Sequence, residues 1–157
     1  MKSKTTEKPY LTLTTKGECV LSSKDDVSVD KLQPSMQEGF DTRIFLHLKD
    51  AADKGQKIAK IRTVDTDIVV IAISLFNKLT IFKLWVGFGS GKSYRDIPIH
   101  SIHELLGPEK CAALPVFHAI TGCDYTSAFR NIGKKTAWKT WEEMPSITQT
   151  FLAMKKI

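Results

Sequence analysis

Two segments towards the C-terminal end of the chain carry residues suited to metal and phosphate chemistry. Thr121-Gly122-Cys123-Asp124-Tyr125 sets an aspartate beside a glycine that permits a tight turn, and Gly133-Lys134-Lys135 follows at an expected helix start. Hard divalent cations prefer carboxylate oxygens, and the start of a helix offers N–H groups to a phosphate. A divalent ion beside a nucleic-acid backbone is the arrangement that a metal-dependent nuclease needs.

Asp65 and Asp67 form a second group of carboxylates. They follow the β-prone run Ile58-Ala59-Lys60-Ile61-Arg62 and precede an apolar run. Ligands of open α/β sheets bind at the carboxyl ends of the strands, so both acids are placed where they could share one divalent ion. The alternative is that one of them caps the following helix and the other is solvated.

Asp41 is a further candidate because it shares the apolar stripe of a predicted helix with Phe45 and Leu48. A buried, unpaired carboxylate costs several kcal/mol, so a cation should lie nearby. That cation is either a metal ion or, in an ordinary ion pair, Arg43 or Arg62.

Simpler roles exist for the first two segments. Asp124 could bond the backbone of its own turn. Lys134 and Lys135 could form a solvated first turn, although the positive end of a helix dipole disfavours lysine there. That misfit favours an anionic partner for the Gly133-Lys134-Lys135 segment.

Two other motifs do not support a cofactor site. The Walker A pattern requires a glycine at position 86, which is Val86, so residues 87–93 are interpreted as a hairpin turn and no nucleotide cofactor is expected. His100 and His103 form His-x-x-His without a nearby third ligand. We interpret both as residues of a helix surface.

The composition is that of an ordinary globular domain. The 157 residues carry a net charge of +6, are 42% hydrophobic and 25% charged, and are expected to form one domain. A basic balance fits a polyanionic partner. Three cysteines far apart in the sequence predict no disulfide framework. The polar N-terminus and the short apolar run Ile68–Ile73 predict an intracellular, soluble protein without a membrane partner, which leaves a nuclear location open.

Strand and helix patterns alternate along the chain. Strands are predicted over Tyr10–Thr14, Glu18–Leu21, Ile58–Arg62, Ile81–Phe88 and Tyr94–Pro98. Helices are predicted over Ser35–Lys54, Ile68–Phe76, Ile99–Leu106, Pro108–Ile120, Gly133–Glu143 and Ser146–Lys156. Ser35 and Glu38 form a capping box at the start of the first helix. Side chains expected to line or edge the core include His47, His118, Trp138 and Trp141.

This order predicts a mixed α/β sheet followed by a helical region. Residues 1–34 are expected to form N-terminal strands and a partly flexible loop. Residues 35–157 are expected to form the main domain, which ends in a helical clamp over residues 121–157.

Several of these segments together resemble the flap endonuclease/XPG group of PIN-like nucleases, over roughly residues 36–143. They are Glu38-Gly39-Phe40-Asp41-Thr42-Arg43, then Val64-Asp65-Thr66-Asp67, then Leu106-Gly107, and last the Gly-Cys-Asp-Tyr motif leading to Ile132-Gly133-Lys134-Lys135-Thr136-Ala137. The last segment resembles the family's helix–two-turn–helix DNA clamp. Residues 115–124 and 134–138 also resemble PIN-like proteins of animal genomes, often found near mobile elements.

The resemblance implies a PIN-like, mostly parallel sheet flanked by helices, with a C-terminal helix–two-turn–helix-like region. Asp41, Asp65, Asp67 and Asp124 match the catalytic, metal-binding carboxylates, which would hold one or two Mg²⁺ or Mn²⁺ ions for phosphodiester hydrolysis. Gly133, Lys134 and Lys135 match the nucleic-acid clamp, with DNA favoured over RNA as the partner.

The sequence departs from the family at two places. Gly39 stands where the family usually carries a second acid, and no segment before Ser35 matches the family's first strand. The resemblance therefore implies an N-terminally truncated member. If active, it is an Mg²⁺- or Mn²⁺-dependent nuclease, and the alternative is a catalytically inactive nucleic-acid-binding remnant of a mobile-element-associated protein.

Overall fold

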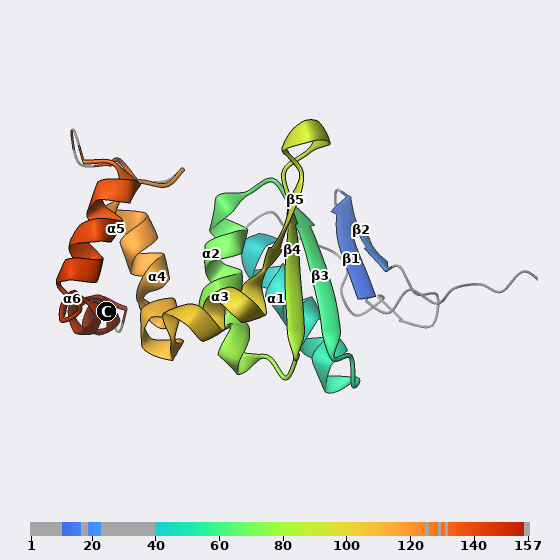
Figure 1. Ribbon diagram of the computed structural model, residues 1–157. Helices are drawn as coiled ribbons and strands as arrows, with labels where there is room; N and C mark the ends of the chain where they lie inside the picture. Colours follow the sequence, from blue (N-terminus) through green and yellow to red (C-terminus); the bar gives the residue numbers. More distant parts are fainter. Residues whose placement is uncertain are drawn as a thin grey trace, which may run out of the picture. The chain divides into compact units, whose positions relative to one another are not determined.

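The computed structural model describes residues 11–16, 19–22, 40–124, 126–128, 130 and 132–155, with side chains from Ile44 onward (Figure 1). The chain divides into two compact units. The sheet unit comprises Met1–Asp65 and Leu79–Pro98, and the helical unit comprises Thr66–Lys78 and Ile99–Ile157. Both units contain part of the region 35–157 that the sequence assigns to one domain, so each is described by itself.

The sheet unit contains a five-stranded sheet in the order β2-β1-β3-β4-β5 (Figure 1). The strands are β1 (Leu11–Lys16), β2 (Cys19–Ser22), β3 (Ile58–Thr63), β4 (Lys83–Phe88) and β5 (Arg95–Pro98). β1, β3 and β4 are parallel, whereas β2 and β5 run antiparallel to their neighbours at the edges. The predicted α/β class is confirmed, and within the described strands the sheet is mixed, with parallel pairing confined to its centre.

One face of the sheet forms the core of this unit. Ala59 and Ile61 of β3 lie opposite Leu84 and Val86 of β4 in the parallel register, and all four are buried. Since alternate residues of a strand point to opposite faces, these four side chains share one side of the sheet. The other side carries Lys60 and its register partner Trp85, which are partly exposed.

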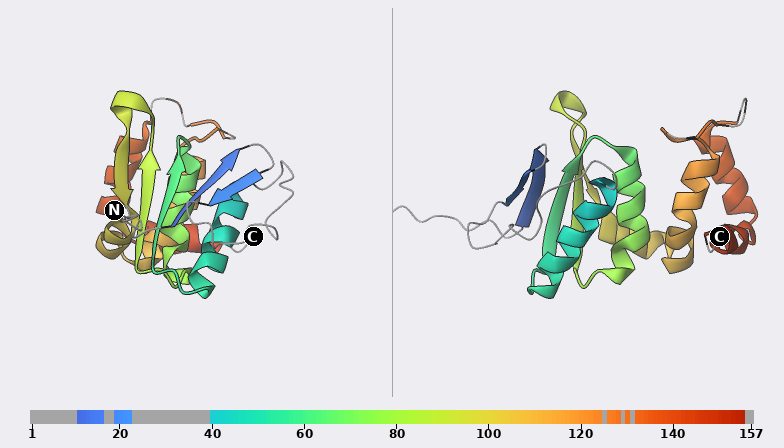
Figure 2. Two further views of the ribbon diagram at one scale, coloured as in Figure 1. Left: turned by 90° about the vertical axis from the view of Figure 1, so that its right-hand side faces the viewer. Right: turned by 180° about the vertical axis from the view of Figure 1, so that it is seen from behind.

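Helix α1 (Phe40–Asp53) lies along the sheet within the same unit (Figure 2). Its buried residues are Phe45, His47, Leu48, Ala51 and Ala52. The helix ends as predicted at Gly55, whose φ of +95° suits a glycine and whose N–H donates to the Ala52 carbonyl at 2.9 Å. The predicted start, with its capping box at Ser35 and Glu38, lies outside the described residues.

Residues 87–93, whose sequence partly matches a nucleotide-binding loop, lie in a hairpin. β4 and β5 pair antiparallel, with Phe88 opposite Arg95, and a short 3-10 turn, η3 (Gly91–Ser93), lies between them. The Ser93 hydroxyl donates to the Ser90 carbonyl at 2.7 Å and closes the turn. The hairpin interpretation is therefore confirmed.

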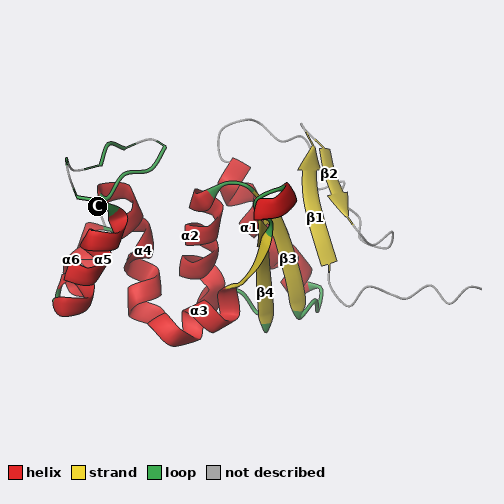
Figure 3. Cartoon of the chain, turned by 45° about the horizontal axis from the view of Figure 1, so that its top comes forward, coloured by secondary structure: helices red, strands yellow, loops and turns green. Residues whose placement is uncertain are grey.

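The helical unit contains α2 (Thr66–Leu75), η2 (Phe76–Lys78), α3 (Ile99–Leu106), α4 (Pro108–Ile120), α5 (Lys134–Glu143) and α6 (Ile147–Met154). α2 packs against α3 and α4, and α4 packs against α6 (Figure 3). The apolar run after Asp67 is a helix, as predicted, and the other helix ends fall within two residues of the predicted ones. Among the described helices, none is long and apolar enough to cross a membrane.

An aromatic cluster joins α4, α5 and α6. Trp141 is 2% exposed, and its ring stacks on Phe117 with centroids 4.9 Å apart and meets Phe151 edge-on at 5.2 Å. Trp138 meets Trp141 edge-on at 5.3 Å and is itself partly exposed. The prediction that both tryptophans serve the core is confirmed most fully for Trp141.

Candidate functional site

Asp67 and His118 are joined by a hydrogen bond within the helical unit. Asp67 Oδ1 and His118 Nε2 lie 2.7 Å apart, and the side chains are 17% and 14% exposed. Asp67 belongs to the first turn of α2 and His118 to the last turn of α4, so these packed helices run antiparallel. The helix dipole favours an acid in the first turn, which suits the position of Asp67.

The Gly-Cys-Asp turn begins where α4 ends. Cys123 and Thr126 exchange two backbone hydrogen bonds of 3.1 and 3.2 Å, and the Thr126 hydroxyl donates to the Ala119 carbonyl at 2.5 Å. These bonds hold the turn against the last turn of α4. Asp124 is exposed on this turn. The antiparallel packing of α2 and α4 therefore brings the predicted ligands Asp67 and Asp124 to the same end of the helical unit.

Lys134 is directed at the end of α4. Its ammonium donates to the Thr121 hydroxyl at 3.1 Å, to the His118 carbonyl at 3.3 Å, and to the Gly122 carbonyl. The last carbonyls of a helix have no partner within the helix and attract a cation. Lys134, at the first position of α5 after the N-cap Gly133, thus satisfies carbonyls at the end of α4. Both Lys134 and Lys135 are exposed.

Asp65 and Asp41 belong to the sheet unit. Asp65 follows β3, and its backbone N–H donates to the Thr63 hydroxyl at 3.0 Å. The boundary between the two units lies directly after Asp65. Asp41 lies in the first turn of α1, and its side chain is outside the described residues. The helical unit thus contains two of the four predicted acids, Asp67 in the first turn of α2 and Asp124 on the turn after α4.

A metal site is not assembled by the side chains that the structure describes. Among them, no three His, Cys, Asp or Glu residues form a group that could hold a metal ion. The Asp41 carboxylate lies outside that set. The chemistry of the predicted ligands fits Mg²⁺ or Mn²⁺, because all four are carboxylates. The metal site therefore stays a prediction.

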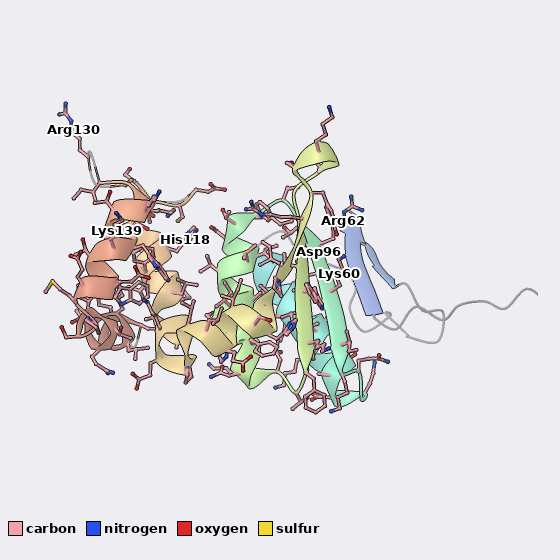
Figure 4. All side chains as sticks on the ribbon, viewed as in Figure 1. Lys60, Arg62, Asp96, His118, Arg130 and Lys139 are labelled. Atoms are coloured by element: carbon pink, nitrogen blue, oxygen red, sulfur yellow. The ribbon has the colours of Figure 1, made fainter. Side chains whose placement is uncertain are left out.

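Basic side chains surround the start of α5. Arg130, Lys135 and Lys139 are all exposed, and Lys135 and Lys139 are one helical turn apart on one face of α5. Figure 4 shows Arg130 projecting from the loop before this helix. The sequence analysis missed Arg130 and Lys139, although the spacing of the two lysines was a usable signal. We refer to Arg130, Lys135 and Lys139 as the basic patch.

Each part of the site comes from a short stretch of sequence. These stretches are the first turn of α2, the turn after α4 and the first two turns of α5.

Comparisons of the chain with protein-family models, with curated proteins and with solved structures found no match.

Proposed function

We propose that the chain is a PIN-like domain of the flap endonuclease/XPG type that hydrolyses phosphodiester bonds in nucleic acid with Mg²⁺ or Mn²⁺. One observation carries the proposal. The packing of α2 against α4 brings Asp67 and the turn of Asp124 to the same end of the helical unit, although they are far apart in the sequence. Both belong to segments that resemble the family's metal-binding motifs.

The order of the elements also supports this proposal. A helix with Asp41 in its first turn precedes β3, and β3 ends two residues before Asp65. A β-hairpin follows, and then the helix–turn–helix arrangement of α4 and α5 around the Gly-Cys-Asp motif. This is the order in which the resemblance places the acidic helix, the Asp-x-Asp and the clamp.

The four predicted acids would hold the ion, and the basic patch would hold the substrate. A bound divalent ion supplies an activated water molecule and neutralises charge on the phosphate. Asp41, Asp65, Asp67 and Asp124 would supply its carboxylate ligands. The N–H groups after Gly133 and the cations of the basic patch would position the nucleic-acid backbone.

The test is cleavage of labelled single-stranded, flap and duplex DNA, and of RNA, by the full chain with Mn²⁺ or Mg²⁺. Cleavage should be abolished by Asp67→Asn and by Asp124→Asn, which keep the side-chain shape but remove the charge. Asp53→Asn, at the exposed last residue of α1, is the matched control. Calorimetric titration with Mn²⁺ accompanies the assay. A chain that neither binds Mn²⁺ nor cuts any of these substrates contradicts the proposal.

A second candidate function is nucleic-acid binding without cleavage. The exposed lysines Lys135 and Lys139, one helical turn apart on α5, favour it. Binding to a labelled oligonucleotide should then need no metal and weaken with salt. The double variant Lys135→Gln/Lys139→Gln should reduce the slope of log K against log salt by about 1.5–2. The control Lys83→Gln/Lys92→Gln removes two exposed charges of the sheet unit, and an equal loss of slope there would exclude a role specific to α5.

A further inference from the structure

The bond between Asp67 and His118 does more than join two helices. A hydrogen bond to one oxygen of a carboxylate restricts the rotation of the whole group. His118 holds Oδ1 of Asp67 at 2.7 Å, and both side chains are largely shielded from water. Carboxylates that bind metals are commonly oriented in this way by a neighbouring hydrogen bond. The interaction is therefore suited to orient Asp67.

The backbone that carries His118 is in turn held by hydrogen bonds at the end of α4. The Thr121 hydroxyl donates to the Phe117 carbonyl at 2.7 Å, and Lys134 donates to the His118 carbonyl at 3.3 Å and to the Thr121 hydroxyl at 3.1 Å. These bonds fix the last turn of α4, from which the imidazole projects. A continuous chain of contacts thus runs from Lys134, at the start of α5, through His118 to Asp67.

The position of the Lys134 ammonium distinguishes it from its neighbour. Three acceptors at the end of α4 surround it, whereas Lys135 belongs to the basic patch; both residues are exposed. An ammonium can donate three hydrogen bonds. The acceptors of α4 account for all three, so the geometry assigns Lys134 to the support of α4 and leaves substrate contact to Lys135.

We propose that His118 is a positioning residue that orients Asp67 for a divalent ion, and that Lys134 is a positioning residue that holds the helix end carrying His118. This inference rests on the proposed function, since it gives Asp67 a metal to bind. It adds two residues outside the four acids to the machinery of the site. It also predicts that the start of α5 influences metal binding in the absence of nucleic acid.

The first measurement is Mn²⁺ affinity by calorimetry, without substrate, together with urea unfolding of the same variants. His118→Leu should weaken Mn²⁺ binding by about 10- to 100-fold. His118→Gln, whose amide can donate to Asp67 from a similar position, should restore most of the affinity. An unfolding midpoint that falls in His118→Leu while Mn²⁺ affinity stays at the wild-type value would show a purely structural bond and overturn the inference.

The second measurement uses Lys134→Met, which keeps the aliphatic stem and removes the charge. Loss of a positive charge should by itself strengthen the binding of a cation, so a weaker affinity for Mn²⁺ has to come from lost positioning. Lys92→Met, an exposed lysine of the sheet unit, controls for net charge. We expect weaker binding in Lys134→Met and no weakening in Lys92→Met. Unchanged or tighter binding in Lys134→Met overturns the role of Lys134.

These measurements separate the two proposals. A wild-type chain that binds no Mn²⁺ contradicts the proposed function, and the roles of His118 and Lys134 with it. If the wild-type chain binds Mn²⁺, and His118→Leu and Lys134→Met bind it equally tightly, this inference is contradicted and the proposed function is not. If His118→Leu does not fold, His118→Gln and Lys134→Met still test the same chain of contacts.

Discussion

The backbone of Gly122 passes so close to Ala128 that a Cβ on Gly122 would lie 2.8 Å from the Ala128 Cβ and 3.0 Å from its backbone nitrogen. Gly122 also has a φ of +94°, a conformation that costs other residues roughly 1–2 kcal/mol. The turn that carries Asp124 thus packs directly against the chain that follows it, at Ala128. Its geometry depends on the absence of a side chain at Gly122.

We therefore expect Gly122→Ala to lower the free energy of unfolding by about 2 kcal/mol or more, because backbone strain adds to a close contact. Gly133→Ala is the matched control. Gly133 has a φ of −77°, and nothing lies within 4 Å of an added Cβ. Its substitution should change the unfolding free energy by less than about 1 kcal/mol. Urea unfolding followed by circular dichroism measures both, and equal effects would contradict the account of the turn.

Trp141 is expected to be the most costly side chain to remove from the helical unit. It is 2% exposed, stacks on Phe117, and its Nε1 donates to the Thr148 hydroxyl at 2.9 Å. Trp141→Ala should lower the unfolding free energy by about 3–5 kcal/mol, because it leaves a cavity among the aromatic rings. Thr148→Val removes only the hydrogen-bond acceptor and should cost about 1 kcal/mol. A loss in Trp141→Ala as small as that in Thr148→Val would contradict the assigned packing.

The element order was predictable because local signals mark the helix ends. Gly55, Gly107 and Pro108 stop or start helices in ways that depend on their own backbone geometry. The apolar run after Asp67 is predicted to be a helix because a strand ends just before it. These predictions needed no knowledge of distant contacts, and the structure confirms them.

The contacts of the site were much less predictable. His118 was interpreted as a residue lining or edging the core, and its bond to Asp67 joins positions 51 residues apart. The Lys134 side chain reaches α4 because the end of α4 and the start of α5 lie close together. Composition and periodicity do not indicate this proximity. The sequence identified Asp67, Asp124 and Lys134 as a group of interest but not which of them touch.

A network of polar groups on the outer face of the sheet is expected to make stability depend on pH. Lys60 Nζ lies 2.7 Å from Asp96 Oδ1, and Figure 4 labels both residues. The Tyr94 hydroxyl donates to the same oxygen at 2.8 Å. Hydrogen bonds from Lys60 and then from Tyr94 hold the pKa of Asp96 below its ordinary range. The hydrogen bond to Asp96 raises the pKa of Lys60.

A lowered aspartate pKa in the folded state adds stability above the ordinary pKa, and this stability is lost as the pH falls through the folded-state pKa. Because the Asp96 side chain is 42% exposed, we expect Asp96→Asn to cost only about 0.2–1 kcal/mol near neutral pH. The difference from wild type should shrink once the pH falls below the ordinary aspartate pKa of about 3.9, and vanish below the lower folded-state pKa of Asp96. Thermal unfolding from neutral to acid pH measures it, with Asp53→Asn as the control. A difference that persists unchanged in acid would exclude the ion pair as its source.

Cys111 and Cys123 are expected to differ sharply in reactivity. Cys111 is fully buried in α4, its Sγ lies 3.8 Å from the His103 carbonyl, and burial raises its pKa to about 11. Cys123 lies on the partly exposed turn beside Asp124. Because the thiolate is the species that reacts, a thiol with a raised pKa and no access to solvent should be inert in the folded protein.

Iodoacetamide at about pH 8 should therefore modify Cys123 at least tenfold faster than Cys111, because the raised pKa and the burial of Cys111 leave almost none of it as accessible thiolate. Peptide mass spectrometry of a Cys19→Ser background separates the two sites. In concentrated urea the rates should converge, since both thiols are then solvated and the burial of Cys111 is gone. This convergence is the internal control for local sequence effects. Rapid modification of Cys111 in the folded chain would mean that α4 opens readily, and the support that α4 gives His118 would then be too weak to orient Asp67.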